Sequence, residues 1–215
     1  MNFDIVWRSR EIFWEATWIS VQLFVLSLIV ATVIGLALAL MRMSRFRVLR
    51  WLSALYVWVF RGLPALVILF FAFFWLGNNL GMSPFQSAIL GLSVSSAAYK
   101  AEIIRAGLLA VDPGQYEASE ALGFTRTHYM RRIVIPQGIR VMIPNYVSNS
   151  TLLFKSTSLA AVIGLTELTG RSRQLANSTF QPIEILTAAG VIYLVVTSLM
   201  TVSQGYFERR FELKA

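Results

Sequence analysis

The feature that most limits this chain is a set of long stretches without any charged residue. No charge falls between Glu15 and Arg42, and the part from Ile19 to Met41 is apolar apart from scattered Ser, Thr, Gln and Gly. A helix rises about 1.5 Å per residue, so this stretch is long enough to cross a hydrocarbon core about 30 Å thick. The sequence therefore predicts a membrane-spanning helix over residues 19–41.

Four further spans are predicted from the other uncharged stretches. The run from Gly62 to Tyr99 is too long for one crossing, and its centre holds the turn-forming residues GNNLGMSP, which divide it into spans at about 53–76 and 85–106. A span at 141–166 has Lys155 as its only charge, and one at 185–207 has none. Charged residues make up only 14% of the chain, against about a quarter in soluble domains. We expect an all-α membrane protein with five transmembrane helices.

The positive charges predict how these helices are oriented. Five spans place residues 41–50, 100–140 and the C-terminal tail on one side, and these segments hold thirteen of the nineteen Lys and Arg residues. The opposite side holds four, and the remaining two, Arg61 and Lys155, lie near or within spans. Basic residues concentrate on the cytoplasmic side of membrane proteins. We therefore expect a periplasmic N-terminus, a cytoplasmic C-terminus and no nucleic-acid partner for the net charge of +8.

Residues 1–16 are expected to lie at the membrane interface. They carry acidic residues and no short apolar core before a cleavage site, so they do not resemble a cleavable signal. Their tryptophans and phenylalanines favour the headgroup level. No repeat or long linker is evident, which predicts a single membrane domain over residues 1–215. The chain has no cysteine, and this excludes disulfides and thiolate metal sites.

The segment 107–140 is the one long loop on the side expected to be cytoplasmic. Asp112, Pro113 and Gly114 form a turn sequence, and the helix formers that follow run to Gly123, a residue suited to the end of a helix. A second helical stretch is predicted over 125–135, ending at Pro136. The first helix and its end carry more apolar surface than a solvated loop needs, at Tyr116, Ala118, Ala121, Leu122 and Phe124. We expect another protein to dock there.

This loop resembles the EAA loop of the membrane subunits of bacterial ATP-binding-cassette importers. The residues that carry the resemblance are Glu117-Ala118-Ser119, Gly123, Ile133 and Ile135-Pro136, where Ser119 stands for an alanine and Ile135 for a leucine. The segments FRGLPALV at 60–67, AAYKAEIIRAG at 97–107, GQYEASEALG at 114–123 and KSTSLAAVI at 155–163 resemble the polar amino-acid branch of that family. The last of these, with the region of Phe180-Gln181-Pro182, looks most like the histidine and octopine permeases.

The resemblance implies an importer subunit of the bacterial inner membrane that imports a polar amino acid, with basic amino acids and opines left open. Its partners would be two ATPase subunits, a second permease subunit and a periplasmic amino-acid-binding protein. The helix before Gly123 would be the coupling helix that contacts the ATPase. The implied contact residues are Glu117, Ala118, Ser119, Gly123 and Pro136.

No nucleotide site is expected in this chain, because no GxxxxGK[ST] sequence occurs in it. ATP and Mg²⁺ would be bound by the partner ATPase, and this chain would have no cofactor and no catalytic residue. His128 is the only histidine, and no metal site is expected around it.

Polar residues at membrane depth are candidates for the substrate pathway, because charge there is costly. Arg61 and Lys155 are the two charged candidates. Snorkelling to the headgroups for Arg61, and hydrogen bonding between helices for the polar stripe around Lys155, are the alternatives. We expect Lys100, Glu102 and Arg105 to form an ion-pair cluster beside the loop. The candidate pathway residues are Arg61, Asn149, Lys155, Ser156, Thr157 and Ser158.

Two other functions compete with the importer subunit. A self-contained channel or secondary carrier fits less well, because carriers commonly show internal repeats with broken helices in each half. A scaffold without transport activity does not explain the polar stripe.

Ser156 stands where many relatives have an aspartate, which removes an acid from the path of a cationic substrate.

Overall fold

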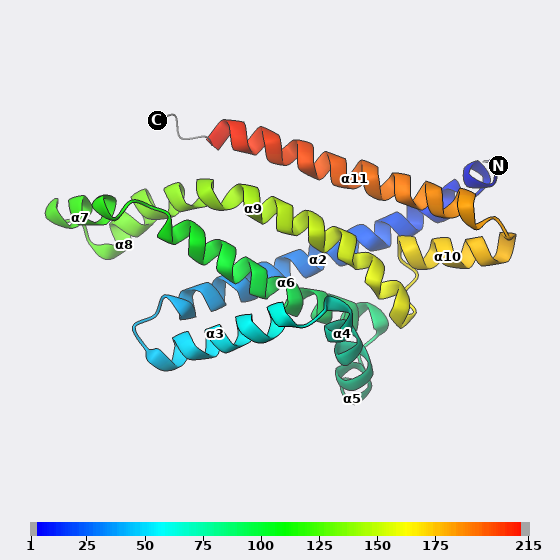
Figure 1. Cartoon of the computed structure of the whole chain (residues 1–215), viewed down its shortest axis with the longest axis horizontal. Coiled ribbons are helices and arrows are strands. Elements are labelled where there is room, and N and C mark those ends of the chain that lie inside the picture. The colour runs from blue at the N-terminus through cyan, green and yellow to red at the C-terminus, as the bar shows by residue number, and fades with distance from the viewer. Residues whose placement is uncertain (1–3, 212–215) are drawn as a thin grey trace.

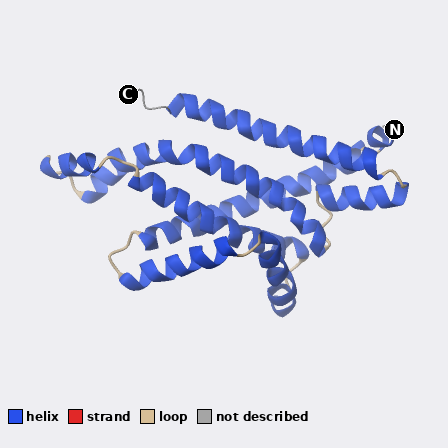
Figure 2. Cartoon of the chain, viewed as in Figure 1, coloured by secondary structure: helices blue, strands red, loops and turns tan. Residues whose placement is uncertain are grey.

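The structure is a computed structural model that describes residues 4–211, and every regular element within them is a helix (Figures 1 and 2). Most are α-helices, η1 and η2 are π-helical turns, and η3 is a 3-10 helix. In chain order they are α1 (Asp4–Arg8), α2 (Arg10–Arg42), α3 (Arg47–Gly62), α4 (Ala65–Phe70), η1 (Phe71–Gly77), α5 (Asn78–Leu80), α6 (Pro84–Leu109), α7 (Pro113–Ala121), α8 (Arg126–Tyr129), η2 (Met130–Val134), α9 (Ile135–Ser156), η3 (Thr157–Ile163), α10 (Leu168–Thr179) and α11 (Pro182–Phe211).

Helix α6 lies at the centre and packs against α2, α3, α4 and α9. Its buried face consists largely of Ser, Ala and Gly. Small residues let helix backbones approach closely, which replaces the hydrophobic driving force that is missing between helices in lipid. The tightest approach to α2 is at Gly35, where a Cβ would lie 2.8 Å from the Cβ of Lys100. The many small residues of α6 thus fit its position inside the bundle.

The predicted all-helical fold is confirmed, whereas the number of spans is not fixed by helix length and composition. Within residues 4–211, two helices are long and apolar enough to cross a membrane, Arg10–Arg42 and Pro182–Gly205. Two bent pairs raise this number to as many as four. The predicted spans 19–41 and 185–207 lie within the two long helices, and 85–106 lies within α6.

The helix of the span predicted at 53–76 is broken within its length. The chain bends by 105° between α3 and the helical segment Ala65–Leu80. Pro64 supplies no N–H, and a residue that precedes proline is driven out of the helical region. Leu63 accordingly has an extended backbone, with φ −91° and ψ 139°.

The prediction that the second helix of the loop ends at Pro136 is wrong. Helices α8, η2 and α9 form one continuous helix that runs through this residue. Pro136 stands in the first turn of α9, directly after the π-helical turn η2. A π turn shifts the hydrogen-bond register by one residue, so it accommodates a proline that would clash with a regular α-helix.

The N-terminal segment 1–16, expected at the membrane interface, divides between α1 and the first turns of α2. Residues 1–3 lie outside the described residues. Helix α2 is therefore longer than the span predicted from its apolar run, because nothing in the sequence from Arg10 to Trp18 breaks a helix.

Glu167 is a structural residue that the sequence reasoning missed. Its side chain is fully buried, and its carboxylate accepts hydrogen bonds from the backbone N–H groups of Thr169 (3.0 Å) and Gly170 (2.8 Å) at the start of α10. It also accepts from Tyr193 on α11 (2.9 Å) and lies 3.2 Å from the Ser20 hydroxyl on α2. One carboxylate thus joins three helices.

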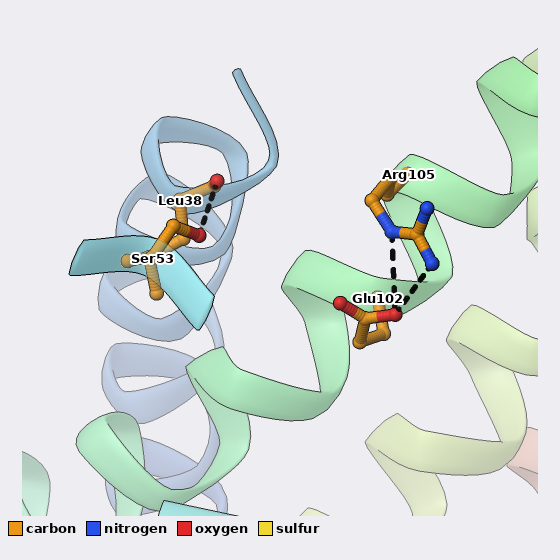
Figure 3. Close-up of polar contacts among 4 residues, drawn as sticks. All are labelled: Leu38, Ser53, Glu102 and Arg105. Carbon is orange, nitrogen blue, oxygen red and sulfur yellow. Dashed lines mark hydrogen bonds and ion pairs between the residues drawn. The ribbon is translucent and has the colours of Figure 1, made fainter. Parts of the chain in front are cut away.

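Several connections lie toward the two ends of the elongated molecule, whereas the α3–α4 connection lies near its middle (Figure 1). The α2–α3 connection, α7 with α8, and the C-terminal end of α11 lie toward one end, and the N-terminal end and α10 lie toward the other. Near the first end, the Ser53 hydroxyl of α3 donates to the Leu38 carbonyl oxygen of α2 at 2.8 Å (Figure 3).

We predict that Gly35→Leu separates α2 from α6 and destabilises the fold, because its Cβ would overlap the Lys100 side chain and approach the backbone of Ala101 to 3.2 Å. Overpacking of this kind costs about 1–3 kcal/mol or more. The measurement is thermal unfolding of the purified protein in detergent. Gly190→Leu on α11 is the matched control, since a Cβ at Gly190 meets nothing within 4 Å. Equal midpoints for both variants would contradict the close approach.

Candidate functional site

Helix α7 is a short helix with a defined beginning. The Asp112 side chain accepts a hydrogen bond from the backbone N–H of Gly114 at 2.6 Å, and Pro113 occupies the first helical turn. An N-cap acceptor satisfies a backbone donor that the helix itself leaves free, and proline is suited to the first turn. The turn sequence at 112–114 therefore begins the predicted helix.

The end of α7 depends on Gly123. Its φ of +73° lies in the left-handed region, which glycine adopts without strain. The backbone N–H of the next residue, Phe124, donates to the Ser119 carbonyl oxygen at 3.0 Å and closes the helix end. The predicted helix end at this glycine is thus what the structure shows.

Two tyrosines fasten α7 to the rest of the chain. The Tyr116 hydroxyl donates to the Leu108 carbonyl oxygen of α6 at 3.1 Å, and its ring packs edge-on against Tyr129 of α8. The Tyr129 hydroxyl donates to the Glu120 carboxylate at 3.2 Å. Burial, followed by this hydrogen bond to Glu120, raises the pKa of Tyr129, so the phenol stays a neutral donor at neutral pH.

Most of the residues predicted to contact an ATPase lie on the surface of this unit. Glu117, Ala118, Gly123 and Pro136 are exposed. Ser119 is not, since it is only 2% exposed and its hydroxyl donates to the Gln115 carbonyl oxygen. Ser119 therefore packs α7 against its own chain and presents no side chain to a partner.

The apolar surface predicted for α7 is concentrated at its tip. Leu122 is 72% exposed and Phe124 is 40% exposed, whereas Tyr116 is half-buried in the contacts described above. His128 packs its ring beside Phe124, with the ring centroids 4.8 Å apart. An exposed leucine and phenylalanine on a rigid helical hairpin form a surface that a partner would cover.

A cavity of about 470 Å³ opens beside the break between α3 and α4. It brings together three of the candidate pathway residues, Arg61 from α3 and Asn149 and Ser156 from α9. No carboxylate is among its lining residues in the part of the chain that the structure describes. They are Arg61, Gly62, Leu63, Pro64, Ala65, Leu92, Ser95, Ser96, Tyr99, Asn149, Leu152, Leu153 and Ser156.

Two polar contacts order the wall of this cavity. The Arg61 guanidinium carbon lies 5.3 Å from the centre of the Tyr99 ring, a cation–π arrangement. The Ser96 hydroxyl of α6 donates to the Asn149 side-chain oxygen of α9 at 3.3 Å. The sequence reasoning missed Ser95, Ser96 and Tyr99, although their spacing places them on one face of a helix.

The other candidate pathway residues do not line the cavity. Lys155, which was expected in the middle of a span, is exposed and lies in the last turn of α9, directly before η3. Thr157 is fully buried, with its hydroxyl donating to the Phe154 carbonyl oxygen. The Ser158 hydroxyl donates to the Lys155 carbonyl oxygen.

The ion-pair cluster predicted for Lys100, Glu102 and Arg105 is confirmed for Glu102 and Arg105 and is wrong for Lys100. Glu102 and Arg105 form an ion pair at 3.0 Å on the surface of α6 (Figure 3). Lys100 points elsewhere: its side chain is fully buried, and its ammonium donates to the Ser150 hydroxyl of α9 at 3.2 Å. Residues two apart on a helix lie on different faces, which explains the separation.

Comparison with known proteins agrees with the predicted resemblance. Residues 31–213 match the family described as "Binding-protein-dependent transport system inner membrane component". The arginine transport system permease protein ArgU of Corynebacterium glutamicum is 41% identical over 211 residues, which cover 90% of this chain and 66% of that protein. The octopine transport system permease protein OccM of Rhizobium meliloti is 40% identical over 208 residues, covering 91% of this chain and 85% of that protein.

Two solved structures share the fold of this chain. One, described as "Crystal structure of an amino acid ABC transporter with histidines", matches with a TM-score of 0.90 and 32% identity and covers 98% of this chain and 99% of that chain. A chain of the MetNI methionine ABC transporter matches with a TM-score of 0.82 at 20% identity, covers 96% of this chain and 99% of that one, and supports the fold alone. The chain belongs to the family of binding-protein-dependent transport system inner membrane components.

Proposed function

We propose that this chain is the transmembrane subunit of an ATP-driven importer that takes up a polar amino acid. Family membership and the amino-acid and opine permeases among its relatives support this function. The observation that carries it is the α7 unit, a rigid helix with its glycine turn and an apolar tip that the chain leaves uncovered.

In this proposal α7 is the coupling helix, and its exposed residues dock in a groove of an ATPase subunit. Glu117, Ala118 and Gly123 lie on the exposed surface beside the apolar tip. The two tyrosine contacts to α6 and α8 hold α7 rigidly, so a displacement of α7 is passed on to the helices that surround the cavity. A partner that binds one arrangement of these helices better than another shifts the equilibrium between them.

The partners we propose are two ATPase subunits, a second permease subunit and a periplasmic amino-acid-binding protein. ATP and Mg²⁺ would be bound by the ATPase subunits, and this chain would act without a cofactor and without an enzymatic activity of its own. The chain would form one membrane domain of the bacterial inner membrane.

We further propose five spans with the N-terminus in the periplasm. The three segments with thirteen of the basic residues include the α2–α3 connection, the α7–α8 region and the C-terminal tail. The first two, and the end of α11 that precedes the tail, lie toward one end of the molecule in Figure 1. Helix α6 completes the five spans, although helix length and composition alone do not identify it as one. Its polar residues are shielded by the neighbouring helices.

The cavity beside Arg61 is the proposed part of the substrate pathway. It lies where the helix is broken at Leu63 and Pro64, and both of these residues line it. Irregular backbone at membrane depth is tolerated where it lines such a space. Arg61, Asn149 and Ser156 are the pathway residues that the cavity brings together.

The first prediction from the proposed function concerns the orientation of the chain in the membrane. A periplasmic reporter enzyme inserted after Gln174 in α10 should be active, and the same reporter inserted after Gly123 should be inactive. A cytoplasmic fluorescent reporter should give the opposite result. Activity of the periplasmic reporter at both positions would contradict the proposed topology.

The second prediction concerns coupling. Gly123→Asp places a Cβ at a φ of +73° and adds a negative charge beside the docking tip, at a cost of about 1 kcal/mol in stability. Uptake by the complete importer should fall at least tenfold, while the amount of protein in the membrane and basal ATP hydrolysis stay near wild type. Thr127→Asp on the exposed face of α8 is the control with the same added charge and should transport normally. Normal uptake by Gly123→Asp would refute the coupling assignment.

The third prediction separates the two charged pathway candidates. Arg61→Gln removes the only charge that lines the cavity among the described residues, and uptake should fall about tenfold or more. Lys155→Gln lies outside the cavity lining and should lower uptake less than twofold. Initial uptake rates in proteoliposomes with the partner subunits decide between them, and an equal loss in both variants would return Lys155 to the pathway.

A further inference from the structure

Lys100 is a buried cation that the proposed coupling and transport steps have not used. Its side chain is fully buried in α6, where its ammonium donates to the Ser150 hydroxyl at 3.2 Å. The same ammonium lies 3.7 Å from the centre of the Tyr146 ring, also on α9. The Tyr146 hydroxyl in turn shares a hydrogen bond with Thr32 of α2. The cation is therefore held in place by a ring and a hydroxyl.

Among the side chains that the structure describes, those of residues 4–205, no carboxylate forms an ion pair with Lys100. The one acid near it in the sequence is Glu102, which pairs with Arg105. An uncompensated charge inside a protein is costly, and a neutral side chain of the same length is often at least as stable there. Ser150 does not need the lysine either, because its hydroxyl also donates to the Tyr146 carbonyl oxygen at 2.7 Å. Packing therefore does not explain the charge.

Lys100 on α6 and its partner Ser150 on α9 are each next to a residue that lines the cavity. Ser96 and Tyr99, one turn and one residue before Lys100 on α6, line the cavity. Asn149, which lines it from α9, is the neighbour of Ser150. The hydrogen bond between Ser96 and Asn149 joins α6 and α9 beside the Lys100–Ser150 contact. In a medium that screens charges poorly, a fixed charge acts on a nearby ligand without touching it.

We propose that Lys100 is a specificity-determining residue, which together with Arg61 makes the cavity select amino acids by charge. Arg61 lines the cavity and Lys100 supports it from behind, while no carboxylate is among the lining residues that the structure describes. Such a site attracts the carboxylates of a substrate and repels a cationic side chain. The substrate class is therefore an acidic or neutral polar amino acid, or one with additional carboxylates, in preference to a basic one. This inference rests on the proposed function of the cavity.

The test measures binding of a charge series to the detergent-purified importer without its binding protein. Radiolabelled L-glutamate, L-glutamine and L-arginine serve as probes, since their side chains differ by one unit of charge at each step. Wild type should bind glutamate and glutamine more tightly than arginine. In Lys100→Met this preference should shrink about tenfold for each unit of side-chain charge, as expected for a unit charge about 10 Å away at an effective dielectric constant of about 20. Lys100→Arg should retain the preference.

The readout is the ratio of affinities, which a merely structural role would not change. A variant that only loosens the contact between α6 and α9 lowers all three affinities together and lowers the thermal midpoint. Arginine bound as tightly as glutamine by wild type, or an unchanged ratio in Lys100→Met, would overturn the inference and leave the cavity as a binding site. Binding of none of the probes to wild type would overturn both the inference and the proposed role of the cavity.

Discussion

The structure depends on one constraint, which is that a backbone inside hydrocarbon must satisfy its own hydrogen bonds. Within the described residues, helices are the only regular elements. The same constraint limits where a helix is allowed to break. The break at Leu63 and Pro64 lies against the cavity, and the π turn before Pro136 lies in the cytoplasmic hairpin of the proposed topology. Two of the places where the regular α-helical hydrogen bonding is interrupted are therefore places that the proposed function uses.

The same constraint explains why the long helix richest in buried small and polar residues lies at the centre. Helix α6 has too many Ser, Ala and Gly residues to face lipid well, and those residues let α2 and α9 approach it closely. A helix buried on all sides is free to carry a lysine and several serines, because its neighbours supply the partners. Close packing and polar function thus have the same origin, the small side chains of α6.

The sequence alone predicted those features that depend on neighbours along the chain. The uncharged stretches predicted the long helices, and the residues Asp112 to Gly123 predicted α7 with its beginning and its glycine end, because caps and turns are local. Residues brought together by packing escaped prediction. Glu167 meets Ser20 and Tyr193 across sequence separations of 147 and 26 residues, and no spacing rule identifies such a contact. The cavity wall was found only in part for the same reason.

The charges show why position decides the meaning of a residue type. Thirteen basic residues, counted by segment, indicate orientation, whereas Arg61 at the cavity and Lys100 behind it act on a ligand. Counting by segment placed Lys100 in the cytoplasmic group, although packing hides it between α6 and α9. Its charge does not contribute to the basic surface and acts instead on the cavity, since an ion acts over a longer distance where water does not screen it. The chain has few charged residues, so the assignment of a single one to the surface or to the interior affects both the inferred orientation and the inferred substrate preference. Only the fold distinguishes these two roles.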